Sequence, residues 1–167
     1  HGSYFVTGNH EYYSGAVAWV EALEGLGVQC LVNAHTTLKH GSAEVVLAGV
    51  TDPSAKWFER THRSDPVKAF EDAPAGNARI LLAHQPKTIA QLTPEMAVDV
   101  QLSGHTHGGQ IFPFHLMAKL QQRFVAGRFR VDRTWLYISR GTGYWGPPFR
   151  VFAPAEITLI TLVDATS

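Results

Sequence analysis

Two histidines stand one residue apart in a glycine-rich segment, Gly104-His105-Thr106-His107-Gly108-Gly109-Gln110. On an extended backbone alternate side chains point the same way, so both imidazoles would face one space, and the small neighbours leave room beside them. Imidazole nitrogen is a common ligand for transition metals. The spacing therefore predicts that His105 and His107 are metal ligands.

Two further segments carry matching chemistry. Asn9 and His10 lie in Gly8-Asn9-His10-Glu11, directly after a short apolar run, and His84 directly follows another. Asn9 and His84, with the histidine pair, offer one amide oxygen and three imidazoles, a mixed donor set that suits Mn, Fe or Zn better than Ca. His10, beside Asn9, is placed to protonate a leaving alkoxide, and Glu11 is placed to orient the His10 imidazole.

Such a donor set suits hydrolysis of a phosphate ester. Two metal ions about 3.5–4 Å apart polarise the phosphoryl oxygens, supply hydroxide at neutral pH and clamp the attacking and leaving oxygens. The predicted reaction is attack of a metal-bound hydroxide on phosphorus.

The elements that must position these residues are short. Apolar runs predict strands, and Ser14 is expected to cap a helix that ends near Leu26. The strands are expected at 4–6, 30–32, 44–50, 79–83, 97–102, 135–139 and 156–163, and a second, short helix at 67–71. Two of these strands deliver His84 and the Gly104 loop at their carboxyl ends, where open α/β sheets place their sites.

The bulk composition narrows the class of protein. A chain of 167 residues with 45% hydrophobic residues suits one domain, residues 1–167. Lys plus Arg (14) equals Asp plus Glu (14), and no basic run forms a patch, so nucleic acid is not an expected partner. A single cysteine, Cys30, excludes an internal disulfide. No run approaches the roughly 18 apolar residues of a membrane-spanning helix.

The three motifs resemble three of the five signature blocks of the calcineurin-like metallophosphoesterases, in the family's order and with similar spacing. The resemblance implies a four-layer α/β/β/α sandwich, two divalent metal ions (Mn, Fe or Zn) and a phosphate-ester substrate. It assigns Asn9, His84 and His105 to one metal and His107 to the other. His10 would contact the phosphate or the leaving group.

A narrower resemblance covers the last third of the chain. The segments 108–111, 139–143, 146–150 and 156–158 are similar to the tail of a branch of membrane-anchored or exported phosphodiesterases, which includes transmembrane proteins with a metallophosphoesterase domain. That branch implies a lipid-linked or nucleotide-linked phosphodiester and membrane association through a segment that this sequence lacks. Arg140 and Arg150 could bind an anionic substrate group or stabilise a C-terminal loop. The oligomeric state stays open.

The family's other two blocks, Asp-x-His and Gly-Asp-x-x-Asp, are absent from this sequence. The bridging carboxylate would therefore be missing, and His107 would be the first metal's only ligand. We expect the chain to be the C-terminal part of a longer enzyme and to be inactive alone.

Two other functions remain open at this point. One is a non-catalytic, phosphoesterase-like scaffold that binds a protein partner, which the missing carboxylates favour. The other is a hydrolase with a single zinc held by His84, His105 and His107, which would lack a carboxylate base.

Overall fold

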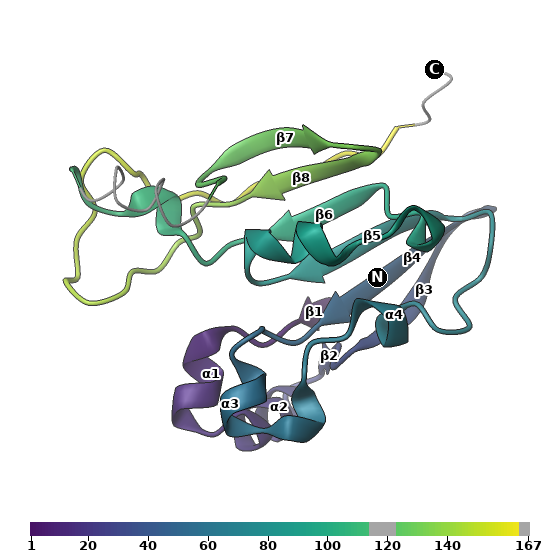
Figure 1. Cartoon of the computed structure of the whole chain (residues 1–167), viewed down its shortest axis with the longest axis horizontal. Helices are drawn as coiled ribbons and strands as arrows, with labels where there is room; N and C mark the ends of the chain where they lie inside the picture. The colour runs from purple at the N-terminus through teal and green to yellow at the C-terminus, as the bar shows by residue number, and fades with distance from the viewer. Residues whose placement is uncertain (114–122, 164–167) are drawn as a thin grey trace.

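A six-stranded mixed sheet forms the centre of the protein (Figure 1). The computed structural model describes residues 1–113 and 123–163. Within them the strand order is β3-β4-β5-β6-β8-β7, in which β4, β5, β6 and β8 run parallel and the edge strands β3 and β7 run antiparallel to their neighbours. The bounds are β3 Ala34–His40, β4 Ala43–Val50, β5 Ala78–Ala83, β6 Val100–Ser103, β7 Gly127–Val131 and β8 Thr134–Ile138.

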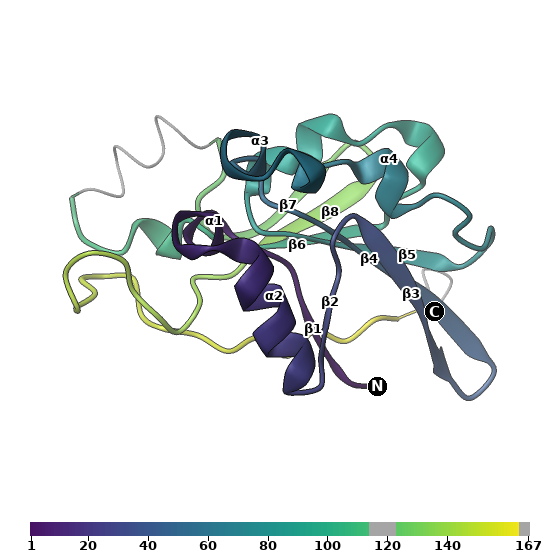
Figure 2. The same cartoon turned by 90° about the horizontal axis from the view of Figure 1, so that it is seen from below.

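Helical segments cover one face of this sheet, and a small second sheet covers the other (Figure 2). The first face carries α4 (Pro66–Ala69) and the 3-10 turns η2 (Pro86–Gln91) and η3 (Pro94–Met96). The opposite face carries the parallel pair β1 (Ser3–Phe5) and β2 (Val28–Cys30), followed outward by α2 (Ala16–Gly25). The order helix, sheet, sheet, helix confirms the predicted α/β/β/α sandwich.

Alternation along β4 explains how two layers pack on one strand. Val46, Ala48 and Val50 are fully buried in the core beneath α4, together with Leu81 of β5. The alternate residue Gly49 faces the second sheet, where an added Cβ would lie 2.6 Å from Cγ1 of Val6 and also collide with Leu31. The missing side chain therefore sets how closely the two sheets approach.

The helix predicted to start at a Ser14 cap is wrong in its boundary. Two helices form instead, α1 (Asn9–Ser14) and α2, separated by Gly15 at φ 94°. Ser14 ends α1, and its hydroxyl donates to the carbonyl of His10 at 2.9 Å. A left-handed glycine ends one helix and reorients the chain for the next.

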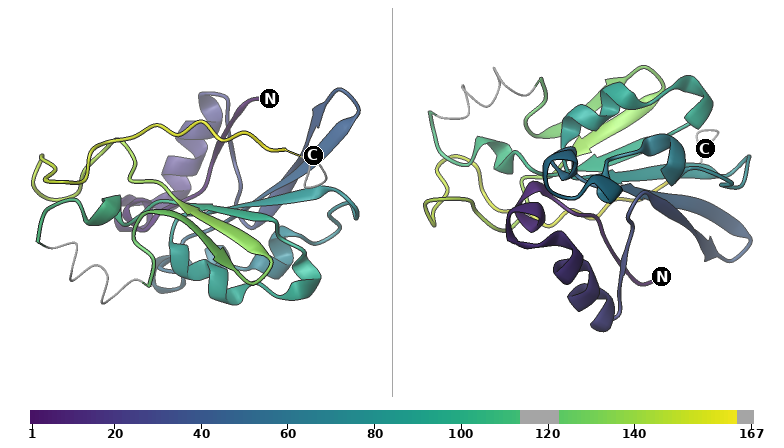
Figure 3. Two further views of the ribbon diagram at one scale, coloured as in Figure 1. Left: turned by 90° about the horizontal axis from the view of Figure 1, so that it is seen from above. Right: turned by 60° about the horizontal axis from the view of Figure 1, so that its bottom comes forward.

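The strand predicted at 156–163 does not form. The Glu156 carboxylate accepts a hydrogen bond from the Arg140 N–H, but the side chains of Ile157 and Leu159 are 92% and 93% exposed. The segment joins no sheet among the described strands. It lies on the same side of the large sheet as β1 and β2 (Figure 3, left). An alternating apolar pattern becomes a strand only when a neighbour accepts its backbone hydrogen bonds.

Candidate metal centre

The carboxyl ends of three parallel strands converge on one edge of the large sheet. β4 leads into Asp52, β5 into His84 and β6 into the Gly104 loop. The Gly104 N–H donates to the His84 carbonyl at 3.1 Å, so the ladder continues past the ends of the strands. From the second layer, β1 ends just before α1, whose first residue is Asn9.

Three donor atoms meet at this edge. Nε2 of His84 lies 3.2 Å from Oδ1 of Asn9 and 3.1 Å from Nδ1 of His105. Ligands bound about 2.1 Å from a metal stand roughly 3.0–3.4 Å apart for octahedral to tetrahedral angles. The two separations therefore fit the edges of one coordination polyhedron, and these residues suit a transition-metal ion.

A glycine lets His84 reach this position. A Cβ on Gly8 would lie 3.0 Å from both Cε1 and Nε2 of His84. Glu11 braces the same turn, because its Oε2 accepts a hydrogen bond from the Gly8 N–H at 2.6 Å. The predicted role for Glu11 was to orient His10; the bond that its carboxylate makes is to Gly8, so it fixes the start of α1 instead.

The environment keeps the imidazoles neutral. Burial, followed by the positive charge of a protonated His105, lowers the pKa of His84 to about 4. Burial also lowers the pKa of His105, against an opposing effect of the Asp52 carboxylate. Metal binding needs the unprotonated ring, so both side chains are ready to coordinate at neutral pH.

Asp52 is the residue that the sequence interpretation overlooked. It is fully buried, and its carboxylate accepts hydrogen bonds from Nε2 of Gln85 at 2.9 and 3.0 Å and from the Ser54 N–H at 2.8 Å. No described cationic side chain pairs with it. The signal was available, since Asp52 follows a buried strand just as His84 does, and the negative charge favours a cation nearby.

The side chains of His105 and His107 contact different partners. The loop is bent rather than extended as predicted, with His105 at φ 69° and His107 at φ 50° in the 3-10 turn His107–Gly109. His105 turns to His84, whereas Nδ1 of His107 lies 3.3 Å from Nη2 of Arg150. Burial and then the Arg150 charge lower the pKa of His107.

His10 lies beside the cluster and is exposed to solvent. Its ring packs edge-to-face on Tyr13, with the centroids 5.6 Å apart. Among the smaller contributions, a charge on His10 lowers the pKa values of His84 and His105, which places it within electrostatic reach of them.

The two arginines organise the C-terminal loop. Nη1 of Arg140 lies 2.8 Å from Oε2 of Glu156. The Arg150 guanidinium donates to the carbonyls of Arg140 at 2.8 Å, Ala153 at 3.1 Å and His107 at 3.2 Å. These bonds support the loop-stabilising role, and substrate binding by the two arginines stays a prediction.

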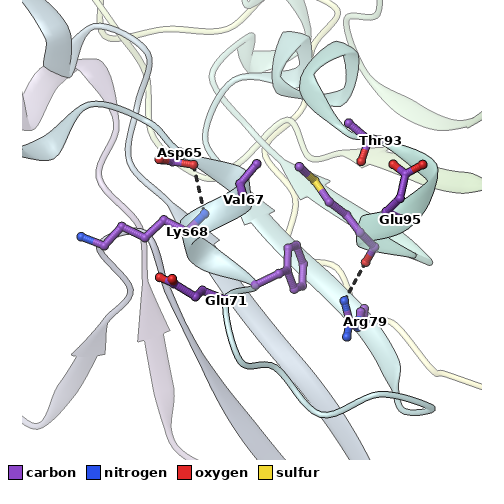
Figure 4. Close-up of a pocket in the computed structure, with 9 residues that line it drawn as sticks. Asp65, Val67, Lys68, Glu71, Arg79, Thr93 and Glu95 are labelled. Carbon is purple, nitrogen blue, oxygen red and sulfur yellow. Dashed lines mark hydrogen bonds between the residues drawn. The ribbon is translucent and has the colours of Figure 1, made fainter.

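A hollow between α4, η3 and the start of β5 lies at the opposite end of the strand from His84 (Figure 4). Its Arg79 guanidinium donates to the carbonyls of Met96, Ala73 and Pro74. Lys68 and Glu71 add charges of opposite sign. With the arginine committed to backbone, the hollow is a packing feature and not a second candidate centre.

Within residues 1–113 and 123–163, no three His, Cys, Asp or Glu side chains gather closely enough to hold a metal ion. The cluster here has two imidazoles and one amide, and it lies at strand ends between two facing sheets. Fold and cluster together define an α/β sandwich with a candidate metal site at its strand ends. Residues 1–109 match the calcineurin-like phosphoesterase family, and the chain belongs to it. That family generally uses a dinuclear metal centre.

Proteins with similar sequences have names that contain the word metallophosphoesterase. An uncharacterized metallophosphoesterase of Helicobacter pylori (strain ATCC 700392 / 26695) is 41% identical over 98% of this chain and 43% of its own length. A transmembrane protein with metallophosphoesterase domain from Danio rerio is 39% identical over 98% of this chain and 39% of its own length. The chain thus spans about two fifths of these relatives.

Among solved structures, the sulfate thiohydrolase SoxB of Thermus thermophilus shares the fold, with a TM-score of 0.57 and 22% identity over 81% of this chain and 27% of that one. Some relatives are named transmembrane proteins. In the described part of this chain, no helix is both long and apolar enough to cross a membrane.

Proposed function

We propose that this chain is part of a metal-dependent phosphodiesterase and supplies one nearly complete metal site. The observation that carries the proposal is the convergence of Asn9 and His105 on His84, whose Nε2 lies 3.2 and 3.1 Å from their donor atoms. These three side chains would hold one divalent ion, and His107 would serve the second.

When bound, two divalent ions would polarise the phosphoryl oxygens and make hydroxide available at neutral pH. The residues of this chain then have separate tasks. Neutral His84 and His105 donate nitrogen lone pairs, and Gly8 leaves the space in which His84 stands. Exposed His10 delivers a proton to the leaving oxygen from the solvent side of the cluster.

The remaining ligands are proposed to come from a longer polypeptide. The Asp-x-His and Gly-Asp-x-x-Asp blocks do not occur in this sequence, and the curated relatives are more than twice as long. Residues 1–167 would then be the C-terminal portion of one catalytic domain, inactive until carboxylates complete the second metal site.

The substrate that we propose is a phosphodiester attached to a lipid or to a nucleotide. The relatives named transmembrane proteins support a reaction near a membrane, and their similarity spans 98% of this chain. Two ions facing one phosphoryl group suit any phosphate ester, so the class of ester rests on the sequence resemblance to the phosphodiesterase branch.

Hydrolysis by the full-length protein tests the proposal. With Mn²⁺ present, bis(4-nitrophenyl) phosphate should be hydrolysed, and His105→Ala should lower kcat/KM at least about a hundredfold. Metal analysis should show one fewer bound ion per protein. His40→Ala, an exposed histidine at the end of β3, is the matched control.

Equal rates for His105→Ala and the parent protein would refute the proposed site. The absence of both bound metal and phosphoester hydrolysis in the full-length protein would instead favour the scaffold function.

A further inference from the structure

Exposed aromatic side chains continue outward from the metal centre. Nδ2 of Asn9, the amide whose oxygen faces His84, donates to the Tyr13 hydroxyl at 3.3 Å. The Tyr13 ring meets Phe58 of α3 (Ala55–Phe58), with the centroids 5.5 Å apart. Trp57 precedes Phe58 in α3. Helices α1 and α3 lie side by side (Figure 3, right), which brings Tyr13 and Phe58 into one surface beside Trp57 in the sequence.

More than half of each of these side chains is exposed. Trp57 is 76%, Tyr13 60% and Phe58 55% exposed. Burying such side chains is worth about 1.5–3 kcal/mol each, so a contiguous exposed group marks an interaction surface.

Basic side chains lie close to these aromatic residues in the sequence. The Lys56 ammonium lies 4.8 Å from the Trp57 ring centroid, and the exposed Arg60 and Arg63 follow within one short segment. Neither arginine side chain has an ion pair or hydrogen bond to any described residue. The one acidic residue of segment 55–63, Glu59, accepts a hydrogen bond from the Thr61 N–H at 3.2 Å.

Trp and Tyr gather at membrane–water interfaces, where the ring is partly buried and its polar edge stays wet. Lys and Arg beside them attract anionic headgroups. We propose that the aromatic–basic surface, formed by Tyr13, Lys56, Trp57, Phe58, Arg60 and Arg63, docks on an anionic lipid bilayer. It rests on the proposed function, since docking here would hold the metal centre at the height of a lipid headgroup phosphodiester.

Tryptophan quenching in the full-length protein tests the docking. The vesicles contain brominated phosphatidylcholine, alone or mixed with phosphatidylglycerol. Emission should be quenched on the mixed vesicles, and Trp57→Phe should remove the largest part of the quenching. Trp135→Phe is the matched control, because Trp135 is also exposed and also has arginine side chains near its ring, but it lies on β8, outside the proposed surface.

Two further variants test whether docking requires the basic side chains. Arg60→Gln and Arg63→Gln should each raise the phosphatidylglycerol content needed for half-maximal quenching about fivefold, the equivalent of about 1 kcal/mol per basic residue. Equal quenching with and without phosphatidylglycerol would overturn the anionic preference.

Identical quenching in Trp57→Phe and the parent protein would overturn the docking itself, as when another polypeptide covers this surface. Hydrolysis of bis(4-nitrophenyl) phosphate by the parent protein is measured in parallel. That substrate has no acyl chain, so its hydrolysis does not depend on docking. Failed docking with intact hydrolysis would refute only this inference, whereas absent hydrolysis would refute the proposed function.

Discussion

Gly8→Ala offers a sharp test of the metal centre, because the added methyl group would touch a proposed ligand. The backbone of Gly8 is extended, at φ −98° and ψ −177°, which alanine adopts without strain. Any effect must therefore come from the new Cβ, which would lie 3.0 Å from Cε1 and Nε2 of His84 and 3.1 Å from Oε2 of Glu11.

The size of the effect follows from that contact. Carbon atoms pack best at about 3.5–4.0 Å, so the imidazole must shift by roughly 0.5 Å. Metal–ligand distances tolerate only about 0.2 Å. Displacing a ligand in this way should weaken Zn²⁺ or Mn²⁺ binding about 10- to 100-fold, the range seen when the support of a ligand is removed.

Isothermal titration of the metal-free full-length protein measures this change. Gly104→Ala is the matched control, since it lies in the loop before His105, has no positive φ and would place its Cβ at least 4 Å from other atoms. We expect weaker binding for Gly8→Ala and unchanged binding for Gly104→Ala. Equal affinities for all three proteins would refute the assignment of His84 as a ligand.

Three further changes test the surrounding structure. Gly49→Ala should lower the free energy of unfolding by about 1–3 kcal/mol, read from urea denaturation, because its Cβ overpacks the space between the sheets; an unchanged midpoint would contradict that packing. Asp52→Asn should weaken metal binding about tenfold by removing a buried negative charge while an acceptor remains for Gln85, and an unchanged dissociation constant would argue against an electrostatic role. The Arg140 N–H and other hydrogen bonds hold the pKa of Glu156 below its ordinary value. Its stabilisation is therefore complete above pH ~4.3 and lost as pH falls through the lowered pKa. The protection of the Arg140 amide from hydrogen exchange should fall over this pH range in the parent protein but not in Glu156→Gln.

The buried strands and the donors at their ends could be predicted from the sequence because both obey local rules. Apolar runs such as 79–83 have one physical outcome, burial between layers, and the residue that follows reaches the sheet edge. The edge strand β3, Ala34–His40, was not predicted, because most of its residues are polar and only its pairing with β4 makes it a strand.

The bend of the His105 loop could not be predicted either. Non-glycine residues rarely take positive φ, and here the contacts of His105 with His84 and of His107 with Arg150 accompany it. Asp52 could be predicted from its place after a buried strand, but its contact with Gln85 could not. Its partner Gln85 is 33 residues away, and only the register of β4 against β5 brings the two together.

The extended segment 156–163 has a practical consequence for work on this chain. Ile157 and Leu159 face solvent beside backbone groups that no described strand engages. An open edge of this kind is a template on which another chain can add a strand. Self-association of the isolated polypeptide at high concentration is the expected hazard, and a charged residue in place of Leu159 is the simplest way to suppress it.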